Sequence, residues 1–201
     1  RQSETILRTM LLHPSQEWQG LELSKELKMS ESWANRILAT LVHKKLAIRT
    51  ERTGKNSKFK IIDRKKLLSN WAMEYYFDHN KLHPYFVLGD PLKKLKTVAA
   101  KEGFQYAITG EYAHNLIKNR PNHAVPYVYI WPSSTSGTNF KDVLKTFEDD
   151  YDFISANNKE NLVIVEPVSK ENVFIGSNEI DGWRVVSDLQ LFLDRGNADD
   201  L

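Results

Sequence analysis

The sequence predicts a two-domain chain of mixed α and β structure, in which a basic helical domain precedes an acidic α/β domain. Its 201 residues leave room for two small domains, and a chain of this size can bury a core without disulfide or metal support. Residues 1–66 carry a net charge of +8, and residues 67–201 a net charge of −6. The pattern of helix and strand signals changes near the same place, which favours two domains with different partners.

The first domain, residues 1–66, begins with signals for three short helices. Apolar residues recur at helical spacing between Ile6 and Leu11, and Pro14 ends that helix. A second helix is expected around the leucines of residues 21–27, and Ser30 is a natural N-cap for a third. The third helix has one apolar stripe, made of Ala34, Ile37, Leu38 and Leu41.

Two strands are expected after the helices, at residues 48–52 and 58–62, joined by the turn-forming residues 53–57. The order is therefore helix, helix, turn, helix and hairpin. Residues 21–62, which read LELSKELKMSESWANRILATLVHKKLAIRTERTGKNSKFKII, carry this order and resemble a winged helix-turn-helix. The resemblance implies that the first domain binds DNA.

The predicted DNA-binding residues lie on the outward face of the third helix and on the hairpin. With the apolar stripe facing inward, polar side chains that suit bidentate contacts to bases face outward, and lysines of the hairpin suit phosphates. The residues expected to contact DNA are Ser30, Ser32, Asn35, Arg36, Arg52, Lys55, Asn56 and Lys58. The alternative for Asn35 and Arg36 is an ordinary solvated helix face. For Trp33, partial burial in the core is favoured over a DNA contact.

Residues 67–84 predict a linker helix. Their apolar stripe includes Leu67, Leu68, Trp71 and Tyr75, so this helix would pack against both domains or against a second copy of the chain. His79 and His83 stand four residues apart, as a helical metal pair would, but no third ligand is apparent, and we favour solvated residues at a helix end.

Residues 85–201 predict an α/β domain with a mixed sheet. Asp90 and Pro91 open a helix that Gly103 ends, and Ser187 caps a last helix. The other helices are expected around Tyr112–Ile117 and Phe140–Phe147. The strands are expected at 105–109, 127–131, 162–165, 173–175 and 183–186.

The start of this second domain resembles the core of a minimal nucleotidyltransferase. In that fold a glycine turn after the first strand holds phosphates, and a later strand carries two carboxylates that bind magnesium. Here the turn is Thr109-Gly110, and Tyr127 and Tyr129 stand where the carboxylates would be. A phenol does not replace a carboxylate as a magnesium ligand at neutral pH. We therefore expect a catalytically silent domain without catalytic, cofactor-binding or metal-binding residues.

Together the two domains resemble the AbiEi-type antitoxins, the regulator halves of type IV toxin–antitoxin, or abortive-infection, systems. TGEYA at 109–113 and VVSDLQLFLD at 185–194 carry the resemblance most sharply. Relatives have a further stretch after this motif, whereas Asp194 is followed directly by Arg195 here. The family implies an autorepressor that binds its own promoter as double-stranded DNA, with a nucleotidyltransferase-like toxin as protein partner.

Two other functions stay open at this point. The second domain could sense a small ligand that tunes DNA binding, or it could be an active nucleotidyltransferase that uses other carboxylates, for which Asp149, Asp150 and Asp152 are the candidates. The absence of cysteine suits a reducing compartment. No apolar run reaches the length of a membrane span and no signal peptide is visible, so we expect a cytoplasmic protein, which could be oligomeric.

Overall fold

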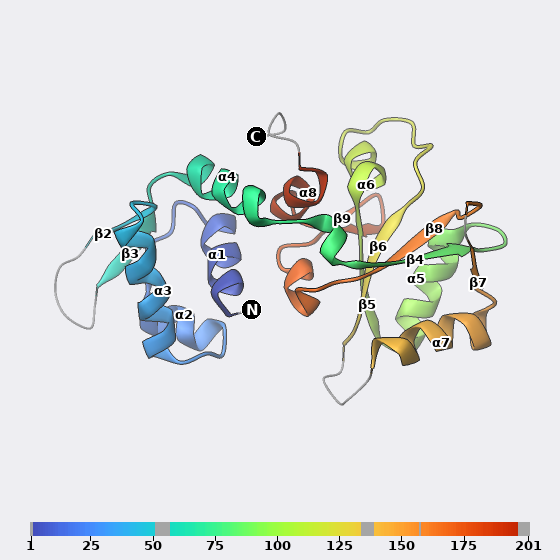
Figure 1. Cartoon of the computed structure of the whole chain (residues 1–201), viewed down its shortest axis with the longest axis horizontal. Helices are drawn as coiled ribbons and strands as arrows, with labels where there is room; N and C mark the ends of the chain where they lie inside the picture. Colours follow the sequence, from blue (N-terminus) through green and yellow to red (C-terminus); the bar gives the residue numbers. More distant parts are fainter. Residues whose placement is uncertain (1, 51–56, 134–138, 157, 197–201) are drawn as a thin grey trace. The chain divides into compact units, whose positions relative to one another are not determined.

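The computed structural model describes residues 2–50, 57–133, 139–156 and 158–196. Within these ranges it has a mixed α+β architecture with eight α-helices and two β-sheets (Figure 1). Contacts along the chain divide it into two compact units, with the boundary between Tyr75 and Tyr76. The described residues before this boundary are called unit 1 and those after it unit 2. None of the described helices is long and apolar enough to cross a membrane.

Unit 1 combines four helices with a small antiparallel sheet. Its strands follow the order β1-β3-β2, with Trp18 opposite Phe59 and Ala47 opposite Ile61. The elements of unit 1 are α1 (Gln2–Leu12), β1 (Trp18–Gln19), α2 (Gly20–Glu26), α3 (Glu31–His43), β2 (Ala47–Arg49), β3 (Lys58–Ile61) and α4 (Arg64–Glu74).

The core of unit 1 comes from the helical stripes that the sequence predicts. In α3, Ala34, Leu38 and Leu41 are buried, and α1 buries Ile6 and Met10. These side chains recur at intervals of three and four residues, so each helix turns one apolar face inward. The predicted helices of residues 2–43 and both strands of the hairpin are present. The short strand β1 was not predicted.

The predicted linker helix over residues 67–84 is wrong in both bounds. Helix α4 begins earlier, because the Asp63 side chain accepts a hydrogen bond from the Lys66 amide at 2.8 Å and caps the helix. It ends at Glu74, and Tyr75 has an extended backbone. The rest of the predicted helix forms a 3₁₀ turn and a strand. Pro84 favours an extended backbone at the residue before it, and that residue pairs with a neighbouring strand instead.

Unit 2 is built on one seven-stranded mixed sheet in the order β7-β4-β8-β6-β5-β10-β9. The pairs β6–β8 and β5–β10 are parallel, and the other pairs are antiparallel. The elements of unit 2 are η2 (Phe77–His79), β4 (Lys81–Phe86), α5 (Pro91–Glu102), β5 (Phe104–Thr109), α6 (Gly110–Ile117), β6 (Tyr127–Pro132), α7 (Phe140–Tyr151), β7 (Ile154–Ser155), β8 (Leu162–Glu166), η3 (Lys170–Phe174), β9 (Asn178–Ile180), β10 (Trp183–Val185) and α8 (Asp188–Arg195).

Helices cover both faces of this sheet. Tyr85 pairs with Leu162 and Tyr129 pairs with Val165, and these partners are three residues apart in β8, so the two tyrosines point to opposite faces. The Tyr85 hydroxyl donates a 2.8 Å hydrogen bond to Glu148 of α7, and burial raises the pKa of this phenol.

The layers follow from these contacts. Helix α5 lies beside α7, since the Lys101 ammonium sits over the Tyr151 ring. On the other face, α8 contacts Tyr129 through Asp194, and α6 lies beside α8 (Figure 1). The result is a helix–sheet–helix sandwich.

One predicted strand of unit 2 is a different element, and three of its strands were not predicted. Residues 173–175 lie in and just after the 3₁₀ helix η3, where the Asn172 amide donates to the Ser169 carbonyl and the Ile175 amide to the Asn172 carbonyl. A run of three apolar residues is too short for its period to distinguish a strand from a helical turn. The strands β4, β7 and β9 were not predicted, because β4 falls within the predicted linker and β7 and β9 are only two and three residues long.

Candidate nucleic-acid interface

Helix α3 presents the polar face that the sequence predicts. Ser30 caps it, and its Oγ accepts a 3.2 Å hydrogen bond from the Trp33 amide. Ser32, Asn35 and Arg36 are exposed, while the apolar stripe faces the core. The geometry therefore leaves these three side chains accessible to a ligand in solution.

Asn35 lies directly against the first residue of α2. A Cβ atom built on Gly20 would fall 2.0 Å from Asn35 Oδ1 and 2.6 Å from its Cγ, so only glycine leaves room for the amide in this position. No sequence signal pairs residues 20 and 35, and the sequence analysis missed Gly20.

Arg36 lies over the indole ring of Trp33, with its guanidinium carbon 5.5 Å from the ring centre. Trp33 is half-buried, in agreement with the partial burial favoured from the sequence. A cation over an aromatic face gains about 0.5–1 kcal/mol at an exposed site. The stack restricts the Arg36 guanidinium, so less conformational freedom remains to be lost when it binds a partner.

The hairpin places further cations beside the helices. Arg49 of β2 is exposed and lies 5.3 Å from the ring centre of the buried Phe59. Lys58 of β3 is half-buried, and its carbonyl accepts a 2.9 Å hydrogen bond from the Thr50 amide. The predicted contact residues Arg52, Lys55 and Asn56 lie outside the described residues.

The first turn of α4 consists of three exposed basic residues, Arg64, Lys65 and Lys66. None of their side chains forms an ion pair with a described residue. Cations at a helix N-terminus oppose the helix dipole, typically at about 0.3–1 kcal/mol each. Residues that are unfavourable for the local structure, as these cations are for the helix dipole, indicate a binding function. A helix N-terminus that also carries cations suits an anion such as phosphate.

No protein-family model, no curated protein and no solved structure matches the chain.

Unit 2 holds a hydrogen-bonded polar cluster at the predicted phosphate turn. Gly110 begins α6 with a φ of +68°, which favours glycine. The Thr109 hydroxyl donates to one oxygen of Asp194. The other oxygen accepts from the Tyr129 hydroxyl at 2.9 Å and from Gln190 Nε2 at 2.6 Å. A carboxylate from α8 thus accepts the Thr109 hydroxyl at this turn, together with donors from β6 and from α8 itself.

A second contact joins α8 to α6 nearby. Arg195 Nη1 lies 2.7 Å from His114 Nδ1, and its Nη2 donates to Glu111 at 3.3 Å. Because a guanidinium has only donors, the imidazole nitrogen is the acceptor. Sequence reasoning missed this cluster, since α8 meets α6, β5 and β6 across 65 to 85 positions of the chain. Of its members, the sequence analysis had considered only Thr109 and Tyr129 as parts of one site.

The two tyrosines of β6 lie on the sheet face that carries this cluster. Tyr127 pairs with Thr109 across the strands, and Tyr129 pairs with Ala107. Tyr129 is fully buried, and both tyrosine rings contact Phe77. Their phenols therefore pack among aromatic and polar side chains of the unit.

The other candidate carboxylates and histidines are dispersed. Asp149 and Asp150 are exposed near the end of α7, and Asp152 ends that helix with a left-handed backbone. His79 lies in η2 and His83 in β4, so the helical pair expected from their spacing does not form. Over the described ranges, no three acidic or histidine side chains gather where a metal ion could bind.

Proposed function

We propose that the protein is a DNA-binding transcriptional regulator whose first domain is a winged helix-turn-helix. In this proposal α3 enters the major groove, and the hairpin and the first turn of α4 contact phosphates. The observation that carries the proposal is the unpaired positive charge at the start of α4, placed on the same unit as the exposed polar face of α3. Lysine and arginine without protein partners are what a polyanion requires.

The roles of individual residues follow from their chemistry. Asn35 and Arg36 are suited to bidentate contacts with adenine and guanine respectively. The Asn35 amide lies in the space beside Gly20, and the Arg36 guanidinium lies over the Trp33 ring. Lys58 and the basic residues of α4 would position the domain on the backbone without reading the sequence.

Unit 2 is proposed to be a catalytically silent, nucleotidyltransferase-like domain that binds a protein. The resemblance to AbiEi-type antitoxins supports a role as autorepressor of a toxin–antitoxin operon, with a nucleotidyltransferase-like toxin as partner. The Asp194 carboxylate supports a catalytically silent domain, because it accepts the Thr109 hydroxyl at the glycine turn and adds a negative charge where a phosphate would have to bind.

Footprinting on the protein's own upstream DNA tests the proposal. We expect protection of one discrete site by nanomolar protein at physiological salt, and protection that weakens steeply as salt rises. The same protein on scrambled DNA of equal length is the control. Equal protection of both DNAs, or none of either, would reject the regulator.

A further inference from the structure

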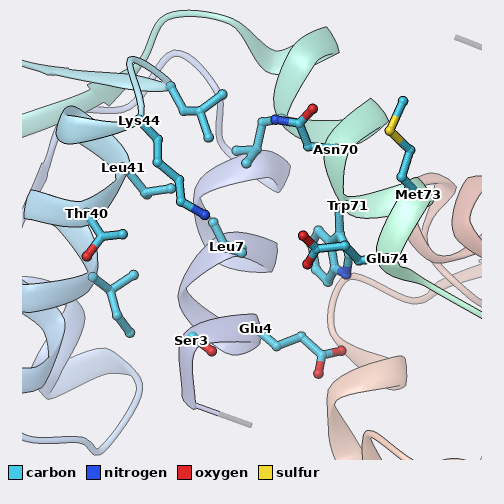
Figure 2. Close-up of a pocket in the computed structure, with 13 residues that line it drawn as sticks. Ser3, Glu4, Leu7, Thr40, Leu41, Lys44, Asn70, Trp71, Met73 and Glu74 are labelled. Atoms are coloured by element: carbon cyan, nitrogen blue, oxygen red, sulfur yellow. The ribbon is translucent and has the colours of Figure 1, made fainter.

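A pocket of about 540 Å³ lies within unit 1, between α1, α3 and α4 (Figure 2). A volume of this size suits a small organic molecule. The apolar side chains that line it are Leu7, Ile37, Leu41, Leu46, Leu67, Trp71 and Met73. Polar side chains of Ser3, Glu4, Thr40, Lys44, Asn70 and Glu74 complete the wall, and all of these except Glu4 are exposed. The lining therefore fits an amphipathic molecule with an apolar body.

The charged side chains of the lining lie on different helices, with Glu74 on α4 one turn after Trp71 and Lys44 just after the end of α3 (Figure 2). An anionic group is therefore favoured at the α3 side of the pocket. Glu4 is already paired, since its carboxylate accepts from Arg8 at 2.8 Å, and Glu74 is exposed to solvent. Lys44 lines the pocket and forms no ion pair with a described residue. Figure 2 shows its side chain extending from the end of α3 toward α1.

A second cation lies behind the wall. Arg8 is fully buried and contacts two residues of the lining. It forms an ion pair with Glu4, and its guanidinium carbon lies 5.1 Å from the centre of the Trp71 ring. Its Nη1 has no hydrogen-bond partner among the described residues. A buried donor left without an acceptor is costly, and more so when it is charged.

We infer that this pocket binds a small amphipathic carboxylate, with its apolar body on the Leu7, Ile37 and Trp71 side chains and its carboxylate at Lys44. The C-terminal half of α3 lines the pocket, and the N-terminal half carries Ser32, Asn35 and Arg36. A ligand in the pocket would therefore hold α3 against α1 and α4. The effect of the ligand on DNA binding rests on the proposed function, whereas binding of the ligand to the pocket does not.

Calorimetry on the full chain with 2-naphthoate tests the site, and 2-naphthamide serves as the uncharged probe of the same shape. We expect saturable binding of one naphthoate per chain and at least tenfold weaker binding of the amide. Lys44→Met should weaken naphthoate at least tenfold. Lys25→Met, at an exposed residue of α2 outside the lining, should leave the affinity unchanged.

A variant that fills the pocket separates this site from weak binding elsewhere. Thr40 is exposed at the pocket wall, so Thr40→Trp should keep the fold, as checked by circular dichroism, and abolish binding of both probes. Equal affinity for the two probes, unchanged affinity in Lys44→Met, or absence of saturable binding would overturn the inference. These measurements contain no DNA, so their failure is distinct from a failure of the proposed regulator.

Discussion

Asn35 and Gly20 pack so closely that a single methyl group on Gly20 would occupy the place of the Asn35 amide, 2.0 Å from its Oδ1. The two residues belong to different helices, with Gly20 at the start of α2 and Asn35 in the exposed face of α3. A proposed base-reading side chain therefore lies in space that Gly20 leaves free on the neighbouring helix.

Gly20→Ala should displace the Asn35 side chain and weaken binding to the specific site by about 1–3 kcal/mol, the range for a lost bidentate base contact. Fluorescence anisotropy with operator and scrambled duplexes measures this. In an Asn35→Ala background, Gly20→Ala should cost nothing further, because the atoms it would strike are gone. Additive losses in the double variant would contradict the coupling.

Asn35→Ala and Arg36→Ala should each cost about 1–3 kcal/mol on the specific site and leave binding to random DNA nearly intact. Lys55→Ala and Lys58→Ala should instead weaken binding to all sequences alike and lower the slope of log K against log salt by about one. Titrations at several salt concentrations separate the two groups. Equal losses on specific and random DNA for both groups would show that the recognition face is misplaced.

Lys65→Glu should raise stability and weaken DNA binding at the same time. An acidic residue in the first turn of α4 complements the helix dipole, and removing the cation relieves its repulsion, for a gain of about 0.3–1 kcal/mol or more in the free energy of unfolding. Urea unfolding and anisotropy measure the two quantities. Lys65→Gln removes the charge without reversing it, so its stability and its DNA affinity should both lie between those of the wild type and of Lys65→Glu. A variant that is more stable and binds DNA normally would exclude α4 from the interface.

Tyr129→Phe should destabilise unit 2 by about 1–3 kcal/mol. The change removes the donor to Asp194 at 2.9 Å and the acceptor of the Asn80 side-chain amide at 3.3 Å, both in a buried site. Tyr76→Phe is the matched control, because Tyr76 is 60% exposed. Urea unfolding followed by tryptophan fluorescence reports the difference, and equal stability of the two variants would show that the cluster around Asp194 contributes little.

Incubation of the protein with magnesium, labelled nucleotides and tRNA or protein acceptors should give no label transfer. Metal-assisted phosphoryl transfer needs ligand oxygens that are anionic at neutral pH, and in the proposed nucleotidyltransferase-like domain Tyr127 and Tyr129 take the strand positions of the metal-binding carboxylates. Label transfer that is lost on mutation of Thr109, Gly110 or Asp149 would contradict this prediction. It would show that the second domain is an active enzyme.

Sequence reasoning succeeded where the signal is local. Ser30, Asp90 and Ser187 each cap the helix expected of them, and their side chains accept hydrogen bonds from amides three residues later. These caps and the helical stripes are properties of neighbouring residues, which a linear pattern records. The first helices, the hairpin and most of the second domain could be placed for this reason.

The misses share a different cause. Strand β4 exists because residues 81–85 pair with β8, about 80 positions away, and β1 exists because Trp18 lies opposite Phe59. The contact of Asn35 with Gly20 and the cluster around Asp194 also join residues from separate elements. A short stretch of sequence carries no signal for pairs that are far apart in the chain. The exposed residues of α3 could therefore be predicted, but not the contact of Asn35 with Gly20.

The sheet of unit 2 is completed by the last segment of the described chain. Strand β10 pairs in parallel with β5, and α8 brings Asp194 to donors on β5 and β6. On a ribosome, the elements of residues 2–75 emerge together, whereas β5 pairs with β6 on one side and waits for about 75 further residues before its second neighbour, β10, is made. We therefore expect synthesis to yield a folded first unit well before the second, and a chain cut short before β10 to leave one edge of β5 unpaired, which invites aggregation.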